Sequence, residues 1–199
     1  MNNDQLINQD SMDTERYTDP KIMELVREFF GKIDLDPASC AGANETVQAI
    51  NFFTKEDDAF SKDWVAEKLW MNHPFTKGEK ACKPKCKKKT CKDPLYKHYR
   101  GSCITEDIPS NLDWIEKLLL EYSLGNFTES LNITFVNSSE AWCQKLLRNG
   151  TQCFITGRVK YKSPNGGNES SPPKGSMITY LGRRKGEFKK VFSKIGVVK

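Results

Sequence analysis

Short apolar segments alternate with amphipathic segments of helical period along most of this 199-residue chain. Apolar residues recur at helical spacing from Pro20 to Gly31, and again over 44–50, 114–122, 140–147 and 187–195. Strand-like runs occupy 33–36, 52–53, 68–71, 131–136, 152–155, 159–161 and 177–181. This alternation predicts an α/β fold, with helices on both faces of one sheet and an antiparallel pair of strands at its C-terminal end.

The composition indicates a globular protein and not a membrane-spanning one. With 37% hydrophobic and 29% charged residues, the chain resembles an ordinary globular domain, and no apolar run reaches the length of a membrane span. Residues 1–16 are polar and lack the apolar core of a signal peptide. We therefore expect a flexible tail over 1–16, one domain over 17–199, no membrane association and a cytoplasmic location. The sequence gives no indication of an oligomeric state.

The first candidate site is the end of the predicted strand 33–36, where Asp36 is followed by Pro37, Ala38 and Ser39. Ligands of open α/β sheets bind at the carboxyl ends of strands. Small residues there let the backbone approach a ligand while a carboxylate meets an ammonium or hydroxyl group. Because Asp-Pro is also a common turn, this segment alone fits either a ligand loop or a turn.

The second candidate site follows strand 68–71 and reads Asn72-His73-Pro74-Phe75. Methylating a base amine requires two acceptors, which draw the amine out of the ring plane and localise its lone pair. An aromatic ring must also stack on the extruded base. The Asn72 side chain, the backbone carbonyl of His73 and the Phe75 ring supply these parts, although an isolated tetrapeptide of this kind can equally be a plain turn.

Taken in order, these and further segments resemble the phage-type Dam DNA N6-adenine methyltransferases, a family that depends on S-adenosylmethionine. The resemblance extends over nearly the whole chain and implies a Rossmann-like methyltransferase sheet and a site of action in the bacterial cytoplasm. The segments that carry it are Tyr17-Thr-Asp-Pro20, Ile33-Asp-Leu-Asp-Pro-Ala-Ser39, Phe52-Phe-Thr-Lys-Glu-Asp-Asp-Ala-Phe60, Leu69-Trp-Met-Asn-His-Pro-Phe75, Ser138-Ser-Glu-Ala-Trp142, Cys153-Phe-Ile-Thr-Gly-Arg-Val-Lys-Tyr161 and Lys174-Gly-Ser-Met-Ile-Thr-Tyr-Leu-Gly182.

The resemblance implies a role for each matching residue. Asn72 and the His73 carbonyl would accept hydrogen bonds from the target amine, and Phe75 would stack on the base. Asp57 or Asp58 would meet the adenine or ribose of the cofactor, and we favour Asp58. Thr18 and Pro20 would flank the pocket for the methionine end of S-adenosylmethionine, and Asp36 would bind its ammonium. The residues that line this end would be Asp36, Pro37, Ala38 and Ser39.

Two departures from the family pattern leave the target base open. His73 stands where the common motif has a second proline. The backbone carbonyl survives the change, and the side chain either adds a group that titrates near neutrality or simply packs. The loop after Asp36 also lacks the glycine-rich form of many methyltransferases. The alternatives to N6-adenine methylation are N4-cytosine methylation and a non-catalytic DNA-binding or anti-restriction protein on the same fold.

The segment directly after the candidate catalytic motif is basic and rich in cysteine. Residues 76–103 hold ten lysines and arginines against two acidic residues, a net charge of +8, so the remainder of the chain carries −3 of the total of +5. Four thiolates at this spacing can close a tetrahedral zinc site, with His98 as a rival ligand. The alternative is free thiols in a mobile loop. The four cysteines are Cys82, Cys86, Cys91 and Cys103.

A basic segment that leaves the catalytic strand end is well placed to contact double-stranded DNA. We expect Lys87, Lys88 and Lys89 to bind phosphates, and Arg158 is a further candidate. The insertion 76–110 would therefore bind both zinc and DNA. The other cysteines are expected to be buried as small hydrophobic residues, namely Cys40, Cys143 and Cys153.

Overall fold

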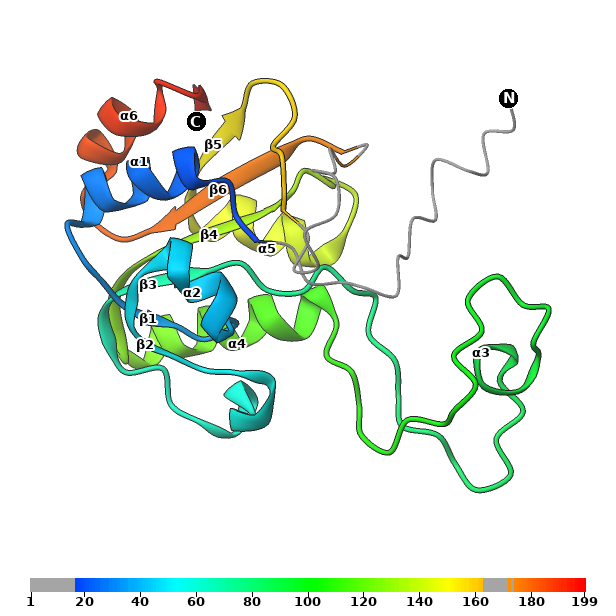
Figure 1. The fold of residues 1–199 in the computed structure, drawn as a ribbon. Coiled ribbons are helices and arrows are strands. Elements are labelled where there is room, and N and C mark those ends of the chain that lie inside the picture. Colours follow the sequence, from blue (N-terminus) through cyan, green and yellow to red (C-terminus); the bar gives the residue numbers. More distant parts are fainter. Residues whose placement is uncertain (1–16, 163–171, 173) are drawn as a thin grey trace.

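The computed structural model describes residues 17–162, 172 and 174–199 and contains one seven-stranded sheet among them (Figure 1). The tail predicted over 1–16 and most of the loop predicted over 163–173 lie outside the described residues. β1 to β4 are mutually parallel, whereas β6 runs antiparallel between β4 and β5, and β7 runs antiparallel to β5. The strands lie in the order β2 (Ala49–Phe52), β1 (Ile33–Asp36), β3 (Ala66–Met71), β4 (Phe127–Phe135), β6 (Ser176–Leu181), β5 (Thr151–Ile155) and β7 (Gly196–Val198).

Helices cover both faces of this sheet, as the sequence predicts. Each face has its own apolar core, and the buried side chains of the helices divide between the two cores. One face is covered by α1 (Pro20–Phe30), α2 (Ala41–Val47) and α6 (Lys185–Phe192), and the other by α4 (Asn111–Leu124) and α5 (Ala141–Asn149). The mixed α/β architecture is thereby confirmed, and it is consistent with a methyltransferase fold.

The start and end of α1 follow directly from the sequence. The Asp19 side chain caps the helix by accepting from the Lys21 amide at 2.9 Å, and Pro20 occupies the first turn. Gly31 ends the helix with a φ of 78°, a conformation that costs glycine little. The buried face consists of Ile22, Met23, Val26, Phe29 and Phe30.

The prediction of a helix over 44–50 is wrong in its second half. The helix α2 ends at Val47, Gln48 adopts a left-handed conformation with φ 59°, and β2 begins at Ala49. The Asn44 side chain accounts for the change, because its amide donates to the Ala49 carbonyl at 3.1 Å and accepts from the Ala49 amide at 2.8 Å. This side chain satisfies the backbone where the helix gives way to the strand.

The C-terminal region also departs from the predicted elements. Residues 159–161 do not form a strand, although Val159 and Tyr161 are buried in the core. The helix predicted to Ile195 ends at Phe192, and β7 follows, a strand that the sequence did not predict. At Gly196 an added Cβ would lie 2.1 Å from the Phe154 carbonyl oxygen, so only glycine allows this strand to pair so closely with β5.

An ion pair between the buried Glu129 and the half-buried Arg184 joins the sheet to the start of α6. The Glu129 carboxylate, in a side chain only 8% exposed, accepts from Arg184 at 2.5 Å and from the Tyr180 hydroxyl at 2.7 Å. The Arg184 guanidinium also lies 4.3 Å from the centre of the Phe29 ring and donates to the Phe29 carbonyl. One guanidinium thus connects β4, α1 and the N-terminus of α6.

Replacing Arg184 by methionine is expected to lower the free energy of unfolding by about 3 kcal/mol, because it leaves the Glu129 carboxylate buried without its counter-ion. Chemical denaturation measures the effect. The matched control is Lys194→Met, which breaks the exposed pair with Glu28 and is expected to cost less than about 1 kcal/mol. Equal losses in the two variants would contradict a structural role for the pair of Glu129 and Arg184.

Residues 76–110, which we call the arm, project away from the body between β3 and α4 (Figure 1). The two sides of the arm pair where they leave the body: the Thr76 hydroxyl donates to the Pro109 carbonyl at 2.7 Å, and Glu79 and Ile108 form a two-hydrogen-bond bridge. A single four-residue helix, α3 (Lys89–Lys92), lies within it. None of its residues belongs to either apolar core, so the arm must be ordered by polar contacts.

No helix among the described residues has both the length and the hydropathy that a membrane crossing would require.

Candidate functional site

The two predicted sites meet at the carboxyl edge of the sheet. β1 and β3 are parallel neighbours with Leu35 opposite Leu69, so Asp36 and Asn72 emerge at the same edge. The chain passes from β1 to β2 on one side and then returns to β3 on the other side of β1. A crevice for a ligand forms where the strand order reverses in this way.

Asp36 is the buried carboxylic acid at this edge among the described residues. Its side chain is 2% exposed, and its carboxylate accepts from the Ala38 amide at 3.1 Å. Burial raises the pKa of the Asp36 carboxyl to about 7, and the hydrogen bond from the Ala38 amide opposes that rise. The loop after Asp36 is held against β2, since the Ser39 amide donates to the Phe53 carbonyl at 3.0 Å. A buried carboxyl whose pKa is near neutrality, at the end of a strand, is well suited to bind a cation.

The neighbouring acidic pair after β2 has a local structural role. The Asp57 carboxylate accepts from the amide and hydroxyl of Thr54 at 2.8 and 2.9 Å, and these two hydrogen bonds lower the pKa of Asp57. Asp58 adopts a positive φ of 48° and accepts from the Phe60 amide at 3.2 Å, but its side chain remains exposed. Asp58 is therefore the more accessible of the two carboxylates.

Asn72 lies one residue beyond β3 and contacts the N-terminal segment. Its side-chain nitrogen donates to the Thr18 hydroxyl oxygen at 3.0 Å. Thr18 is 3% exposed and stands directly before the cap of α1. The structure therefore joins two predicted site residues that lie 54 positions apart. Pro20, in the first turn of α1, is half-buried.

The side chain of His73 points into the protein. It is 1% exposed, its Nε2 lies 3.1 Å from the Asn111 Oδ1, and its ring stacks on Trp114 at 6.0 Å. Burial lowers the pKa of the imidazole to about 4, so His73 is neutral at physiological pH. Of the two sequence-based alternatives, the structure favours packing over titration near neutrality.

Phe75 is packed among aromatic rings. Its centroid lies 4.4 Å from that of Phe135, 5.4 Å from that of His73 and 6.3 Å from that of Tyr161. The ring remains half-buried, as does Pro74 before it. The segment 72–75 thus combines one half-buried amide, one buried imidazole and one aromatic ring at the edge that also holds Asp36.

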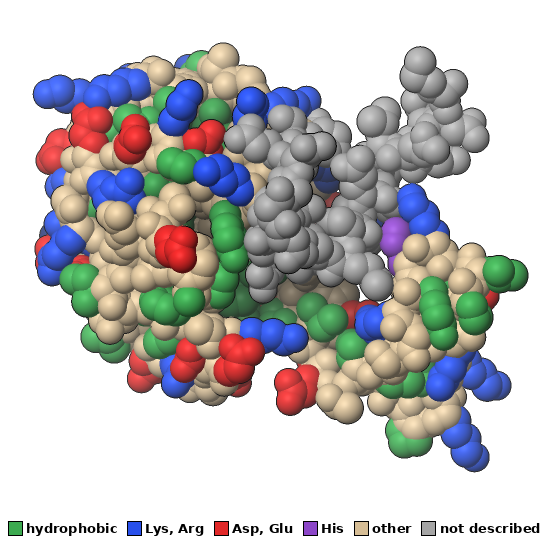
Figure 2. Space-filling model, viewed as in Figure 1, with side chains coloured by type: hydrophobic (Ala, Val, Ile, Leu, Met, Phe, Trp, Pro, Cys, Tyr) green, Lys and Arg blue, Asp and Glu red, His purple; other side chains and the backbone are tan. Residues whose placement is uncertain are grey.

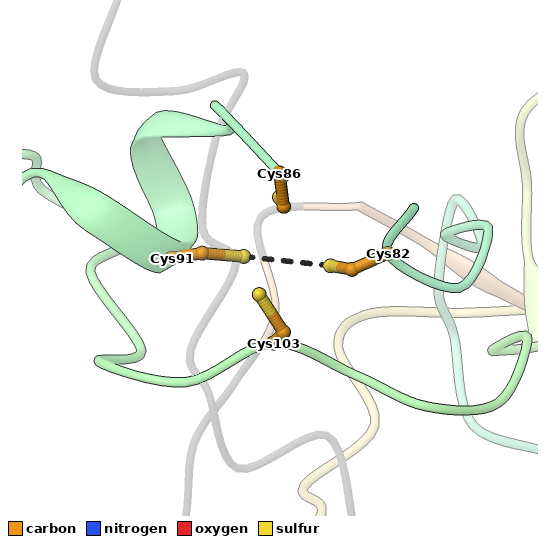
Figure 3. Close-up of side chains that lie close together, drawn as sticks. All are labelled: Cys82, Cys86, Cys91 and Cys103. Atoms are coloured by element: carbon orange, nitrogen blue, oxygen red, sulfur yellow. Dashed lines mark hydrogen bonds between the residues drawn. The ribbon is translucent and has the colours of Figure 1, made fainter. Parts of the chain in front are cut away.

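A cysteine cluster orders the arm (Figure 3). The sulfur atoms of four cysteines all lie within 4.8 Å of one another, and those of Cys82 and Cys91 are 3.6 Å apart. Tetrahedral zinc, with Zn–S bonds of about 2.3 Å, requires sulfurs about 3.8 Å apart, so the donor set fits this metal. The cluster consists of Cys82, Cys86, Cys91 and Cys103. His98 lies outside it and packs edge-on against Tyr96, so it is not a ligand in this arrangement.

Cationic groups and backbone amides surround the four sulfurs. Arg100 donates to the Cys91 sulfur at 3.3 Å, and the Lys88 amide donates to the Cys86 sulfur at 3.4 Å. Glu79 holds both side chains, accepting from Arg100 at 3.0 and 3.3 Å and from the Lys88 ammonium at 3.0 Å. Such contacts would stabilise the negative charge of the cysteines as thiolate ligands of a metal. Of the other three cysteines, Cys143 and Cys153 are buried as predicted, whereas Cys40 is half-buried at the start of α2.

The predicted DNA-binding cations differ in their surroundings. Lys87 and Lys89 are exposed on the arm, whereas Lys88 is half-buried and bound to Glu79. Arg158 is exposed on the body, and its guanidinium lies beside Gly175. Figure 2 shows Lys and Arg side chains gathered on the outer surface of the arm, while the body carries both signs of charge.

Three contacts were not predicted from the sequence. These are Thr18 with Asn72, His73 with Asn111, and Glu79 with Arg100. Of these three contacts, only the one between His73 and Asn111 had a signal in the sequence. The helix-capping pattern of Ser110 and Asp113 places Asn111 in the first turn of α4.

A protein-family model described as DNA N-6-adenine-methyltransferase (Dam) matches residues 8–196. No curated protein and no solved structure gives a significant match.

Proposed function

Because the chain belongs to the Dam family of DNA N-6-adenine-methyltransferases, we propose that it methylates the adenine amine with the residues at the carboxyl ends of β1 and β3. The family reaction is methylation of adenine N6 in DNA, and neither N4-cytosine methylation nor a non-catalytic DNA-binding role is favoured by this membership. The observation that carries the site assignment is the shared edge, at which both the half-buried Asn72 amide and the buried Asp36 carboxyl emerge.

In the proposed mechanism the segment 72–75 binds the extruded base. The Asn72 Oδ1 and the His73 backbone carbonyl accept hydrogen bonds from the two N6–H groups, which makes the nitrogen lone pair available for attack on a methyl group. The bound S-adenosylmethionine would supply an electrophilic methyl carbon, so that the new N–C bond would form as its C–S bond breaks, and the amine proton would pass to water. Phe75 stacks on the base. The burial of the His73 side chain supports this role, because it holds the backbone at this position.

We assign the cofactor S-adenosylmethionine, which supplies a methyl group on a sulfonium, to a Rossmann-like sheet edge formed by β1 and β2. Asp36 would bind the ammonium of its methionine moiety, with the backbone of Pro37, Ala38 and Ser39 close by. Asp58, the exposed member of the acidic pair, would meet the adenosine moiety. The raised pKa of Asp36 supports the first assignment, since a buried carboxyl of this kind gains most from a cationic partner.

The affinity for S-adenosylmethionine is expected to rise from pH 5 to pH 7. Free Asp36 is largely protonated below its pKa of about 7, whereas the complex requires the carboxylate, so binding releases a proton. Affinity should then increase by up to about tenfold per pH unit in this range. Calorimetry at several pH values measures it. Asp36→Asn should abolish the slope and Asp58→Asn should keep it; a slope that survives in Asp36→Asn would assign the ammonium to another residue.

We further propose that the arm holds one structural zinc ion between its four cysteines and lies along double-stranded DNA. The sulfur spacing and the surrounding donors support the metal. The net charge of +8 over residues 76–103, next to the catalytic motif, supports the DNA contact. Lys87 and Lys89 would bind phosphates, as would Arg158, while Lys88 would fix the arm through Glu79.

The double variant Lys87→Ala/Lys89→Ala is expected to bind DNA more weakly and with less dependence on salt. Loss of two phosphate contacts should reduce the slope of log K against log salt by about 1.8. Fluorescence anisotropy with a duplex at several salt concentrations measures this slope. The matched control replaces the exposed Lys189 and Lys190 of α6 by alanine and should leave it unchanged. Equal slopes in both double variants would remove the arm from the DNA interface.

The proposed function is tested by incubating the protein with methyl-labelled S-adenosylmethionine and duplex DNA and analysing the nucleosides. Labelled N6-methyladenine is the expected product. Label in N4-methylcytosine, or no labelled nucleoside, would contradict the proposal. A parallel assay with single-stranded DNA establishes whether the duplex is the substrate.

A further inference from the structure

Large apolar side chains are exposed on the arm. Leu95 is exposed to 95%, more than any other large hydrophobic side chain among the described residues, and Tyr96 and Tyr99 are each exposed to 37%. Pro94 is exposed as well, and we call these four residues the apolar patch. Figure 2 shows hydrophobic side chains on the surface of the arm beside those of Lys and Arg. Four such residues within one turn indicate a surface that a partner covers.

The backbone of the apolar patch is fixed by hydrogen bonds. The Asp93 carboxylate accepts from the Leu95 amide at 3.0 Å, and the Asp93 carbonyl accepts from the Tyr96 amide at 3.0 Å. The Arg100 amide donates to the Thr90 carbonyl at 2.6 Å, which ties the end of the turn to α3. Leu95 is therefore presented on an ordered turn, and little backbone freedom is lost when a partner covers it.

The charges around the apolar patch favour an anionic partner. Lys92 precedes the patch and Lys97 lies within it, and both side chains are exposed. The carboxylate of Asp93, the acidic residue of this turn, is turned back onto the Leu95 amide. An apolar side chain among cations fits a partner with an anionic outside and an apolar interior. Duplex DNA has this character, because its phosphates flank a stack of bases.

We propose that Leu95 inserts between the bases of duplex DNA, while Lys92 and Lys97 bind the flanking phosphates. Apolar wedges, leucine among them, enter base steps from the minor groove and kink the duplex. This inference rests on the proposed contact between the arm and DNA. It adds a contact with bases to the phosphate contacts of Lys87 and Lys89, which position a protein on DNA without reading the bases.

Leu95→Ser is expected to weaken binding to duplex DNA by about tenfold without changing the slope of log K against log salt, because it removes an apolar contact and no charge. Its affinity for heparin, a polyanion without bases, should equal that of the wild type. Fluorescence anisotropy measures both affinities. The matched control is Leu124→Ser, which replaces another exposed leucine at the end of α4 far from the arm and should bind DNA and heparin as the wild type does.

The insertion itself is measured with duplexes that carry 2-aminopurine at successive positions. The fluorescence of this base rises when its neighbours unstack. The wild type should raise the fluorescence at a base step where Leu95→Ser leaves it quenched, at protein concentrations that saturate the duplex in both cases. The same step should show the wild-type signal with Leu124→Ser.

Several outcomes would overturn the insertion. Equal affinity of Leu95→Ser and the wild type for the duplex is one, and an equal loss of affinity for heparin is another, because the bases would then not be involved. A smaller mass of Leu95→Ser in sedimentation would assign the apolar patch to contact between copies of this chain. If Lys87→Ala/Lys89→Ala lowers the salt slope while Leu95→Ser binds normally, only the insertion fails. If the wild type does not bind duplex DNA, the proposed DNA contact of the arm fails with it.

Discussion

The Asn72→Ala variant is expected to lose methyl transfer by about a thousandfold while it still binds S-adenosylmethionine. Removing one preorganised group that acts on the reacting atoms costs about 100- to 1000-fold in rate. The residues assigned to the cofactor lie on β1 and its loop and retain their own contacts, such as the Ala38 amide on Asp36. Single-turnover transfer and calorimetric binding, measured on the same preparation, separate the two effects.

Two further variants make this result specific. Asn72→Asp restores an oxygen acceptor and is expected to recover part of the lost rate. Asn51→Ala removes an exposed asparagine from β2 and should transfer at the wild-type rate. Full activity in Asn72→Ala would place the catalytic centre elsewhere, and loss of cofactor binding in that variant would assign Asn72 to the cofactor instead of the base.

The ends of β1 and β3 were predictable because each strand signal is local. The alternating segment 33–36 stops at Asp36-Pro37, and the apolar run before Asn72 stops at Asn72-His73-Pro74. Both strands end as predicted. The boundary between α2 and β2 was not predictable in this way. It depends on the Asn44 side chain, which satisfies the backbone of Ala49 five residues later.

The contacts within the candidate site required the three-dimensional structure. The hydrogen bonds of Asn72 with Thr18 and of His73 with Asn111 join residues 54 and 38 positions apart. No local periodicity encodes such pairs, because they follow from where the segment before α1 and the start of α4 lie relative to the end of β3. The sequence also left open whether His73 titrates near neutrality, and the burial of its side chain favours packing, because burial lowers the pKa of the imidazole.

The spacing of the cysteines was a stronger sequence signal than any for the contacts of Asn72 and His73. The residues that would bind a zinc ion could nevertheless not be derived from this spacing. His98 and Cys103 both follow Cys91 at distances that a loop can close. In the structure the chain turns back so that the Cys82 amide donates to the Ile104 carbonyl at 2.9 Å, which brings Cys103 and not His98 to the other three sulfurs.

Substitution of Cys91 by serine, or removal of metal by a chelator, is expected to unfold the arm and leave the body folded. Cys91 is the only apolar side chain of the arm that is fully buried, and the arm contributes no residue to the two apolar cores of the body. Its order would therefore depend on the proposed zinc ion and on the ion pairs around Glu79. The wild type should contain one zinc ion per chain, and Cys91→Ser should contain none.

Three measurements follow the arm and the body separately. Elemental analysis gives the zinc content, limited proteolysis should cut the variant within residues 76–110, and circular dichroism should show a body that keeps its helices. Affinity for duplex DNA should fall at least about tenfold, because disordered lysines must be fixed on binding at a cost in conformational entropy. Cys40→Ser, which replaces a half-buried cysteine at the start of α2, is the matched control and should retain zinc.

An arm that resists proteolysis after complete removal of metal would mean that Glu79 and its partners suffice to fold it. In that case the four sulfurs would serve as packing groups, and the DNA-binding surface would be independent of zinc.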